Sequence, residues 1–328
     1  MREFEKPDFL LLLSLISEAT KGRLVENHLS INAAYGKGYA WACLLPSGIS
    51  VLVADSILNQ EIFFKRLAGD DNYFCLQFTE QSVEAGAHRK FSNDLQSYVK
   101  LTHTINEEVF HLPAGVRVQT VAFFFNKDHF AAVLGKSVMD EMLTQHFPLL
   151  IQNNNLQPIA TADRIMLDEL LVEKVQHPLR VNFIQNRILL LLENFIIKLH
   201  RKQEVTEKKV KRTDDETMRL MKVEALLARN FEKAPPTIDE LSRISAMSPT
   251  KLKNDFKALY GLPIYEYYQK NRMIKAKSLL MLGKYSIKEV GIMVGYSNLS
   301  HFANTFKKEF GHLPSELAAR DGVLVYNT

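Results

Sequence analysis

The sequence predicts a multidomain α+β protein with a β-rich N-terminal part, a helical middle and an all-α C-terminal domain. Its 328 residues, 46% of them hydrophobic, are enough for two domains with their own cores. The hydrophobic period changes from strand-like to helical near residue 130, and the C-terminal third contains an internal repeat. We therefore divide the chain into a β-rich domain (1–130), a helical appendage (131–203), a linker (204–215) and a helical domain (216–320).

Short strand-like segments fill the first part of the chain. Residues 49–53 are β-branched and apolar, 73–78 alternate, and 116–125 alternate before becoming continuously apolar. Turn residues separate these segments, and strands at this spacing favour a sandwich or a barrel. The apolar segment Phe9–Ile16 is too short to span a bilayer and follows acidic residues, so we expect a packed segment rather than a membrane anchor or signal peptide.

Three helices are expected before the linker. Apolar residues recur at helical spacing over 130–142, 162–175 and 181–201, and Thr161 is a candidate N-cap. The apolar face of 181–201 is wide enough to need more than one partner. Two explanations stay open, burial in the core and a subunit interface. Residues 200–215 are almost purely polar and charged, which is typical of an interdomain connection.

The C-terminal domain contains two copies of one helical unit. Thr237–Leu241 aligns with Ser286–Val290 at a shift of 49 residues. The second half of each copy aligns at a shift of 50, pairing Leu252, Phe256, Lys257 and Gly261 with Phe302, Phe306, Lys307 and Gly311. A repeat in which apolar, capping and glycine positions all correspond indicates a duplicated structural unit.

Each copy reads as a short helix, a tight turn and a second helix. Thr237 with Glu240, and Ser286 with Glu289, have the spacing of capping boxes that start a helix. Gly295 can supply a positive φ in the second turn. Two helices joined in this way form the motif that inserts its second helix into a DNA major groove. A helical-repeat module that binds proteins is the alternative.

The exposed positions of the two second helices suit DNA. The residues we expect to reach base edges are Thr250, Asn254, Ser300, His301 and Asn304. The residues we expect to contact phosphates are Lys251, Lys253, Lys257, Lys307 and Lys308. Residues 216–320 contain seventeen Lys and Arg and ten Asp and Glu, a net charge of +7, which leaves −3 for the rest of the chain. This asymmetry is expected when one end of a protein meets a polyanion.

A long helix is expected between the two copies, over about 263–283, where apolar residues can pack on both units and fix their separation. The residues that carry a family resemblance are Arg272, Ala276, Leu279-Leu280, Ser286-Ile287, Glu289-Val290, Gly295-Tyr296, Phe302, Phe306-Lys307-Lys308, Gly311 and Pro314-Ser315. Over about 221–317 the chain thereby resembles the AraC/XylS family of bacterial transcription regulators. One departure is Leu317-Ala318, where the family has an aromatic residue followed by Arg.

The resemblance implies a cytoplasmic, dimeric regulator of the activator type that binds promoter or operator DNA and can contact RNA polymerase. It also implies that the N-terminal strands form a cupin-like barrel that binds a small-molecule effector, and that the helices after it dimerise. By the family's pattern, Thr250, Asn254, Ser300, His301 and Asn304 are the base-facing positions.

Two alternatives to this interpretation remain. An effector-independent regulator would use its N-terminal domain for dimerisation or protein contacts alone. A cupin-type metalloenzyme would need clustered ligands, but His88, His103, His111 and His129 are scattered, so we expect no enzyme, no metal and no cofactor. Cys43 and Cys75, the only cysteines, have no disulfide or metal spacing and favour a reducing interior. Tyr35, Tyr39 and Trp41 are read as core residues rather than as the wall of a site.

Overall fold

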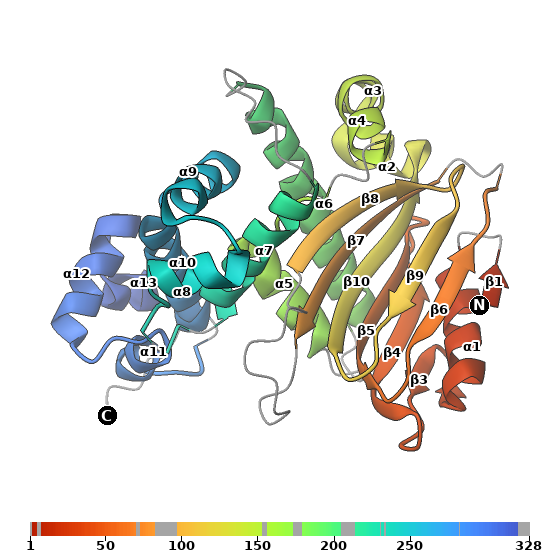
Figure 1. Ribbon diagram of the computed structural model, residues 1–328, viewed down its shortest axis with the longest axis horizontal. Helices are drawn as coiled ribbons and strands as arrows, with labels where there is room; N and C mark the ends of the chain where they lie inside the picture. Colours follow the sequence, from red (N-terminus) through yellow and green to blue (C-terminus); the bar gives the residue numbers. More distant parts are fainter. Residues whose placement is uncertain are drawn as a thin grey trace. The chain divides into compact units, whose positions relative to one another are not determined.

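The fold is described from a computed structural model. It describes residues 2–4, 8–69, 73–82, 97–152, 156–172, 179–204, 214–229, 231–232, 234–281 and 283–320. Contacts divide the chain into two compact units, Met1–Ile159 with Met166–Lys209, and Ala160–Ile165 with Val210–Thr328 (Figure 1). We call them the N-terminal unit and the C-terminal unit and treat each by itself. The linker expected over 204–215 falls almost entirely outside the described residues.

The N-terminal unit contains two β-sheets (Figure 1). The strands of the larger sheet are β2 (Arg23–Val25), β3 (His28–Ser30), β4 (Gly36–Leu44), β5 (Ser50–Leu58), β7 (Tyr73–Ser82), β8 (Ser97–His103) and β10 (Arg117–Asn126). Its order is β2-β3-β4-β5-β10-β7-β8, antiparallel throughout. The smaller sheet has the order β1-β6-β9 and consists of β1 (Arg2–Phe4), β6 (Ile62–Arg66) and β9 (Glu108–Leu112).

Helices precede and follow these strands. They are α1 (Phe9–Thr20), α2 (Lys127–Leu134), α3 (Lys136–Glu141), the π-helix η1 (Met142–His146), α4 (Phe147–Gln152), α5 (Thr161–Leu171) and α6 (Arg180–Glu204). The three predicted segments are helical where the structure describes them, although the first is divided into several short pieces; residues 173–175 of the second lie outside the described residues. The prediction that Thr161 caps α5 is wrong, because the residue lies inside the helix and its Oγ1 has no hydrogen-bond partner among the residues described.

The pleat of the larger sheet separates two apolar cores. On β10, Val121, Phe123 and Phe125 point to the face that packs with Ile188 and Leu191 of α6. The residues between them on the same strand, Ala122 and Phe124, point to the other face, where α1 and the smaller sheet cover them. The apolar face of α6 is thus buried in the unit's own core, which confirms one of the two explanations for its width.

The described strands do not form the closed cupin-like barrel that the resemblance implied. β8 is hydrogen-bonded to β7 and β9 to β6, so the edges of the two sheets meet through side chains instead of a ladder. The fully buried Arg66 of β6 donates from Nη1 to the carbonyl oxygen of Thr104 at 2.9 Å, just past the end of β8. The Lys100 ammonium on β8 lies 2.6 Å from the Glu108 carboxylate on β9. These contacts connect the edges of the two sheets without a backbone ladder.

The described part of the C-terminal unit is helical. Its helices are α7 (Asp214–Arg229), α8 (Ile238–Ser245), α9 (Pro249–Tyr260), α10 (Ile264–Met281), α11 (Ile287–Met293), α12 (Leu299–Phe310) and α13 (Pro314–Arg320). The long helix expected between the copies is α10. All of its predicted packing residues are buried: Ile264, Tyr268, Met273, Ala276, Leu279 and Leu280.

None of the described helices has the length and apolar character needed to cross a membrane. Cys43 is half-buried and Cys75 is buried, and both are unbridged. Burial raises the pKa of the Cys75 thiol to about 12. Trp41 is buried in the core behind the larger sheet, in line with its assignment to the core.

Candidate nucleic-acid interface and a cavity in the N-terminal unit

Both helix-turn-helix units begin with a complete capping box. The Thr237 hydroxyl accepts from the Glu240 N–H at 3.3 Å, and the Glu240 carboxylate accepts from the Thr237 N–H at 2.7 Å. Ser286 and Glu289 repeat the arrangement at 3.2 and 2.7 Å. These hydrogen bonds lower the pKa of both glutamates. The predicted capping boxes are confirmed, and each satisfies the N–H groups left unpaired at a helix start.

The turns of the two units share a left-handed residue but differ in chemistry. Ala246 has φ 50° in the first unit, and Gly295 has φ 78° at the equivalent position of the second. A Cβ on Gly295 would lie 2.1 Å from the Phe231 carbonyl oxygen. Glycine is therefore required in the second turn both for its conformation and for the close approach of another backbone segment.

Arg272 of α10 holds the second turn in place. Its Nε donates to the Val294 carbonyl oxygen at 2.7 Å, and its guanidinium lies 4.1 Å from the ring centroid of Tyr296 and 5.3 Å from that of Tyr268. The Tyr296 ring in turn lies 5.4 Å from the ring of His301, at the start of α12. The linking helix and the second recognition helix are thereby connected through one arginine and one tyrosine.

The structure places all ten predicted DNA-contacting residues on exposed positions of α9 and α12. Ser248 caps α9 with proline following at N1, and Asn298 caps α12. Leu252 and Phe256, like Phe302 and Phe306, are buried on the opposite faces of these helices. Burial of one side fixes the rotation of each helix, and the predicted base and phosphate residues are thereby turned to solvent.

Lys251 differs from the simple phosphate contact that the sequence indicated. Its ammonium lies 2.8 Å from the Asp255 carboxylate and 3.1 Å from that of Glu216 on α7. Hydrogen bonds to Asp255 and then Glu216 raise its pKa. The position of Lys251 along α9 could be read from the sequence, but the carboxylate that α7 brings to it could not.

A buried ion pair within the C-terminal unit was missed by sequence reasoning. The Glu224 side chain on α7 is fully buried and accepts two hydrogen bonds from the Arg164 guanidinium, both at 2.6 Å. The Tyr267 hydroxyl on α10 donates to the same carboxylate at 2.8 Å. Burial and the nearby Glu224 charge hold the pKa of Tyr267 well above its ordinary range. The three residues are far apart in sequence and share no motif.

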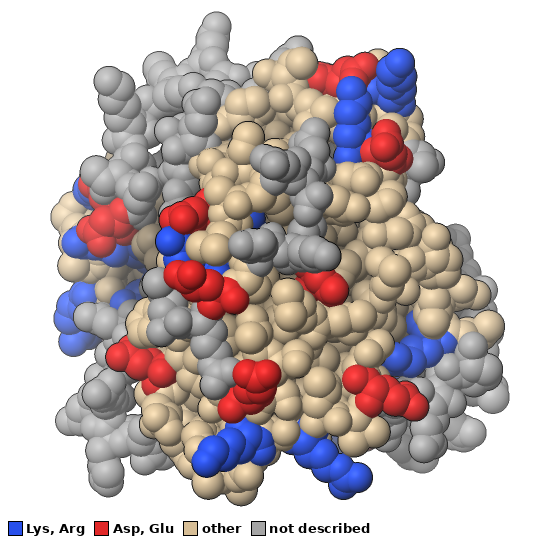
Figure 2. All heavy atoms as spheres, turned by 90° about the vertical axis from the view of Figure 1, so that its right-hand side faces the viewer, with Lys and Arg blue, Asp and Glu red and all other residues tan. Residues whose placement is uncertain are grey.

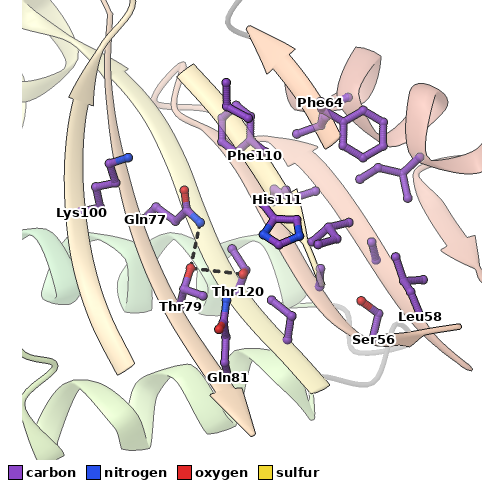
Figure 3. Close-up of a pocket in the computed structure, with 18 of the residues that line it drawn as sticks. Ser56, Leu58, Phe64, Gln77, Thr79, Gln81, Lys100, Phe110, His111 and Thr120 are labelled. Carbon is purple, nitrogen blue, oxygen red and sulfur yellow. Dashed lines mark hydrogen bonds between the residues drawn. The ribbon is translucent and has the colours of Figure 1, made fainter. Parts of the chain in front are cut away.

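The N-terminal unit contains a cavity of about 230 Å³ between its two sheets (Figure 3). Strands β5, β10, β7 and β8 line one side of it. Leu12 and Ile16 of α1, Phe64 of β6 and Phe110 of β9 belong to the opposite side. Lys100 of β8 and Glu108 of β9, whose side chains connect the two sheet edges, belong to the lining of the cavity.

A chain of uncharged polar groups crosses the sheet side of the cavity. Gln77 Nε2 lies 2.8 Å from Thr79 Oγ1, which lies 3.3 Å from Thr120 Oγ1 on the adjacent strand, as Figure 3 shows. Tyr98 is hydrogen-bonded to Thr79, and burial raises the pKa of the Tyr98 hydroxyl. Thr79 and Thr120 are directly paired in the sheet register, so both hydroxyls reach the same face.

The histidines that the structure describes lie apart from one another in different contacts. His103 packs edge-on against Phe74, and His111 stacks on Phe63 and lies 3.3 Å from the Glu61 carboxylate. Over the described residues, no group of three His, Cys, Asp or Glu side chains has the geometry to hold a metal ion. His88 lies outside the described residues.

Figure 2 shows one face of the molecule, on which basic and acidic side chains are interspersed over a mostly uncharged surface. By composition, the net positive charge is concentrated in residues 216–320 instead. Such an interspersed face offers a polyanion no continuous positive surface.

Comparison with known proteins agrees with the C-terminal geometry. A family model described as a helix-turn-helix domain matches residues 241–320, which begin within α8 and include α9, α10 and the whole second unit. The C-terminal domain of this chain is of the AraC type. The matched residues include the second capping box, the glycine of the second turn and the long connecting helix, and the first capping box lies directly before them.

Several curated relatives match about a quarter to a third of this chain. The regulator GlxA of Rhizobium meliloti is 29% identical over 31% of this chain and 30% of its own length. The bifunctional transcriptional activator and DNA repair enzyme AdaA of Bacillus subtilis is 33% identical over 24% and 37%. The regulator ArgR of Pseudomonas aeruginosa is 31% identical over 28% and 27%. The chain spans about a third of the length of these relatives.

Solved structures with partial similarity include two regulators. An AraC-type DNA-binding regulator from Chromobacterium violaceum is 27% identical and covers 33% of this chain and 96% of its own, with a TM-score of 0.30. Apo ToxT from Vibrio cholerae is 17% identical and covers 82% of this chain and 96% of its own, also with a TM-score of 0.30.

Proposed function

We propose that this protein is a sequence-specific transcription regulator that binds duplex DNA through α9 and α12. The observation that carries the proposal is the pair of helix-turn-helix units joined by α10, each with a second helix whose outer face is polar and basic. Helix dipoles, lysines and short polar side chains at such positions suit phosphate and base contacts. The relatives that match this domain are named as transcriptional regulators, which supports the same reading.

In this proposal the two recognition helices enter successive major grooves on one side of the duplex. Such grooves lie about 34 Å apart, so the site is asymmetric and extends over roughly two helical turns. Asn254 and Asn304 are the residues best suited to bidentate contacts with adenine. Lys257 and Lys307 would neutralise phosphates, which makes the affinity fall steeply as salt concentration rises.

The test separates base contacts from phosphate contacts in the full-length protein. Asn254→Ala and His301→Ala should cost about 1–3 kcal/mol on the selected site and relax base choice locally. Lys257→Ala should weaken binding to all sequences about equally, because phosphates carry no direct sequence information. Lys270→Ala, which removes an exposed lysine from α10, is the matched charge control.

Site selection from random DNA followed by footprinting of these variants provides the measurement. Equal losses for Asn254→Ala on selected and on random duplexes would remove this residue from the base-contacting set. An unmodified protein that selects no sequence and shows no dependence on salt would refute DNA recognition itself.

We further propose that the cavity between the two sheets binds a small-molecule effector. Its support is the enclosed volume together with the polar chain of Gln77, Thr79 and Thr120 along one side. An effector can act only by binding one state of the protein better than another, so it must change both thermal stability and DNA affinity. Ala54→Leu places extra volume in the cavity and should abolish both responses to any compound that binds there.

The alternative is a regulator without an effector, whose N-terminal unit only forms dimers. Leu190 and Ile197 are exposed by 41% and 39%, and their spacing of seven residues puts them on one side of α6. We propose this side as the dimer contact in either case. Sedimentation of the Leu190→Glu/Ile197→Glu variant should show a shift to monomer, and an unchanged mass would exclude this face.

A further inference from the structure

We propose that the cavity of the N-terminal unit takes an uncharged ligand with one apolar face and at least two neutral hydrogen-bonding groups along one edge. Small aromatic or cyclic compounds that carry amide or hydroxyl groups belong to this class. The proposal rests on the effector site proposed above and adds the chemistry of the ligand. It is carried by three features of the cavity: its size, the division of its lining into two sides, and the pairing of its charged side chains.

The size of the cavity limits the ligand to a small molecule. About 230 Å³ lies just below the range of about 300–1,000 Å³ for drug-sized ligand pockets. A water molecule occupies about 30 Å³ of liquid, so the cavity is much larger than a site for one or two structural waters.

The sheet side of the cavity supplies neutral hydrogen bonds. Gln77, Thr79 and Thr120 form a continuous chain across β7 and β10, and Tyr98 joins it from β8. Each hydroxyl has one donor and two acceptor positions, so the chain has capacity beyond its internal hydrogen bonds. Polar side chains are costly at half-buried positions that apolar residues could fill, which favours a ligand as their partner.

The opposite side of the cavity supplies apolar contacts. Phe64 is fully buried there, beside Phe110 of β9 and the aliphatic side chains of Leu12 and Ile16 on α1 (Figure 3). A ligand between these walls would therefore place a flat apolar face on the phenylalanines and a polar edge on Thr79 and Thr120. Such a division selects molecules whose polar groups lie on one side.

The charged side chains of the lining neutralise each other. Lys100 and Glu108 lie 2.6 Å apart and are exposed by only 18% and 12%. A carboxylate ligand would have to displace Glu108 from Lys100 and then leave the Glu108 charge buried beside it, and a cationic ligand would do the converse to Lys100. Separating a mostly buried pair is costly because it leaves one charge without compensation. A neutral ligand avoids this cost.

The test compares amides with the acids of the same shape in the full-length protein. Benzamide and benzoate form one pair, and indole-3-acetamide and indole-3-acetate form another. Saturation-transfer NMR and thermal shift should show that the amides bind at least about tenfold more tightly than the acids. The Ala54→Leu variant identifies the signal that comes from the cavity.

Two substitutions test the lining itself. Thr120→Val keeps the shape and β-propensity of the residue but removes a hydroxyl from the chain, and it should weaken amide binding by about 3- to 10-fold. Thr144→Val, which removes an exposed hydroxyl of η1, is the control and should have no effect. Glu108→Gln leaves Lys100 beside a neutral partner and should allow the acids to bind.

The outcomes separate the ligand class from the effector site. Acids that bind the cavity as tightly as their amides would overturn the ligand class and leave the effector site standing. Acids that remain unbound in Glu108→Gln would overturn the charge argument. If no amide and no acid gives a binding signal that is lost in Ala54→Leu, both the ligand class and the effector site are wrong. DNA recognition is tested separately by footprinting.

Discussion

Gly295 offers a quantitative test of the packing of the C-terminal unit. The equivalent position of the first copy is occupied by Ala246, so the two copies differ there. Gly295→Ala places a Cβ on a residue with φ 78° and within 2.1 Å of the Phe231 carbonyl oxygen. The left-handed conformation costs a non-glycine residue about 1–2 kcal/mol. Forced displacement of well-packed backbone adds about 1–3 kcal/mol. We expect Gly295→Ala to destabilise the domain by about 2–5 kcal/mol.

Two other positions isolate the contribution of the close approach. Gly311 has φ 80° with nothing within 4 Å of a Cβ, so Gly311→Ala should cost only the conformational part, about 1–2 kcal/mol. Ala246 already has φ 50° in the first copy, so Ala246→Gly should be close to neutral or slightly stabilising.

Hydrogen exchange measured by mass spectrometry on peptides of the C-terminal unit gives the change in opening free energy for each variant in the full chain. Equal losses for Gly295→Ala and Gly311→Ala would refute the argument, because the conformational cost alone would then explain both.

Three further predictions concern single side chains. Asp255→Asn removes one carboxylate from the ion pairs of Lys251, so the affinity for random DNA should rise. The plot of log affinity against log salt concentration should become steeper by about one phosphate contact, and an unchanged slope in a filter-binding titration would contradict this. Cys75, whose pKa is raised to about 12, should resist iodoacetamide at pH 8 in the folded protein, and peptide mapping that finds it alkylated would contradict the burial. Glu289 should titrate below its ordinary pKa of 4.5, so its cap stabilises α11 at neutral pH and loses that effect as pH falls through the lowered value; carboxylate NMR shifts report the midpoint.

The C-terminal unit was predictable from sequence because its signals are local. A capping box spans four residues, and a glycine that ends a helix follows its last apolar position directly. The identical order of these signals in two copies removed the ambiguity that a single helical hairpin would have. The same locality explains what was missed, since the approach of Phe231 to Gly295 and the partner of Lys251 on α7 depend on the packing of distant segments.

The N-terminal unit was predictable only as a set of strands and helices. Alternation identified β7 and β10, but their register, which sets Thr79 beside Thr120, follows from pairing across the sheet. Closure of a barrel depends on whether the edge strands β8 and β9 form backbone hydrogen bonds with each other. No local pattern in their sequences indicates whether they do. Buried groups such as Arg66 and the Arg164–Glu224 pair carry charges that sequence patterns normally place on the surface.

The 18-residue helix α10 has a consequence for how target promoters can vary. A helix of this length is about 27 Å long, and its residues are buried against both units, so their separation cannot change without unpacking the domain. On the proposed mode of binding, a promoter that gains or loses a few base pairs between the two contacted grooves would rotate one of them away from its helix. Insertions and deletions there should therefore be selected against as strongly as changes in the contacted bases.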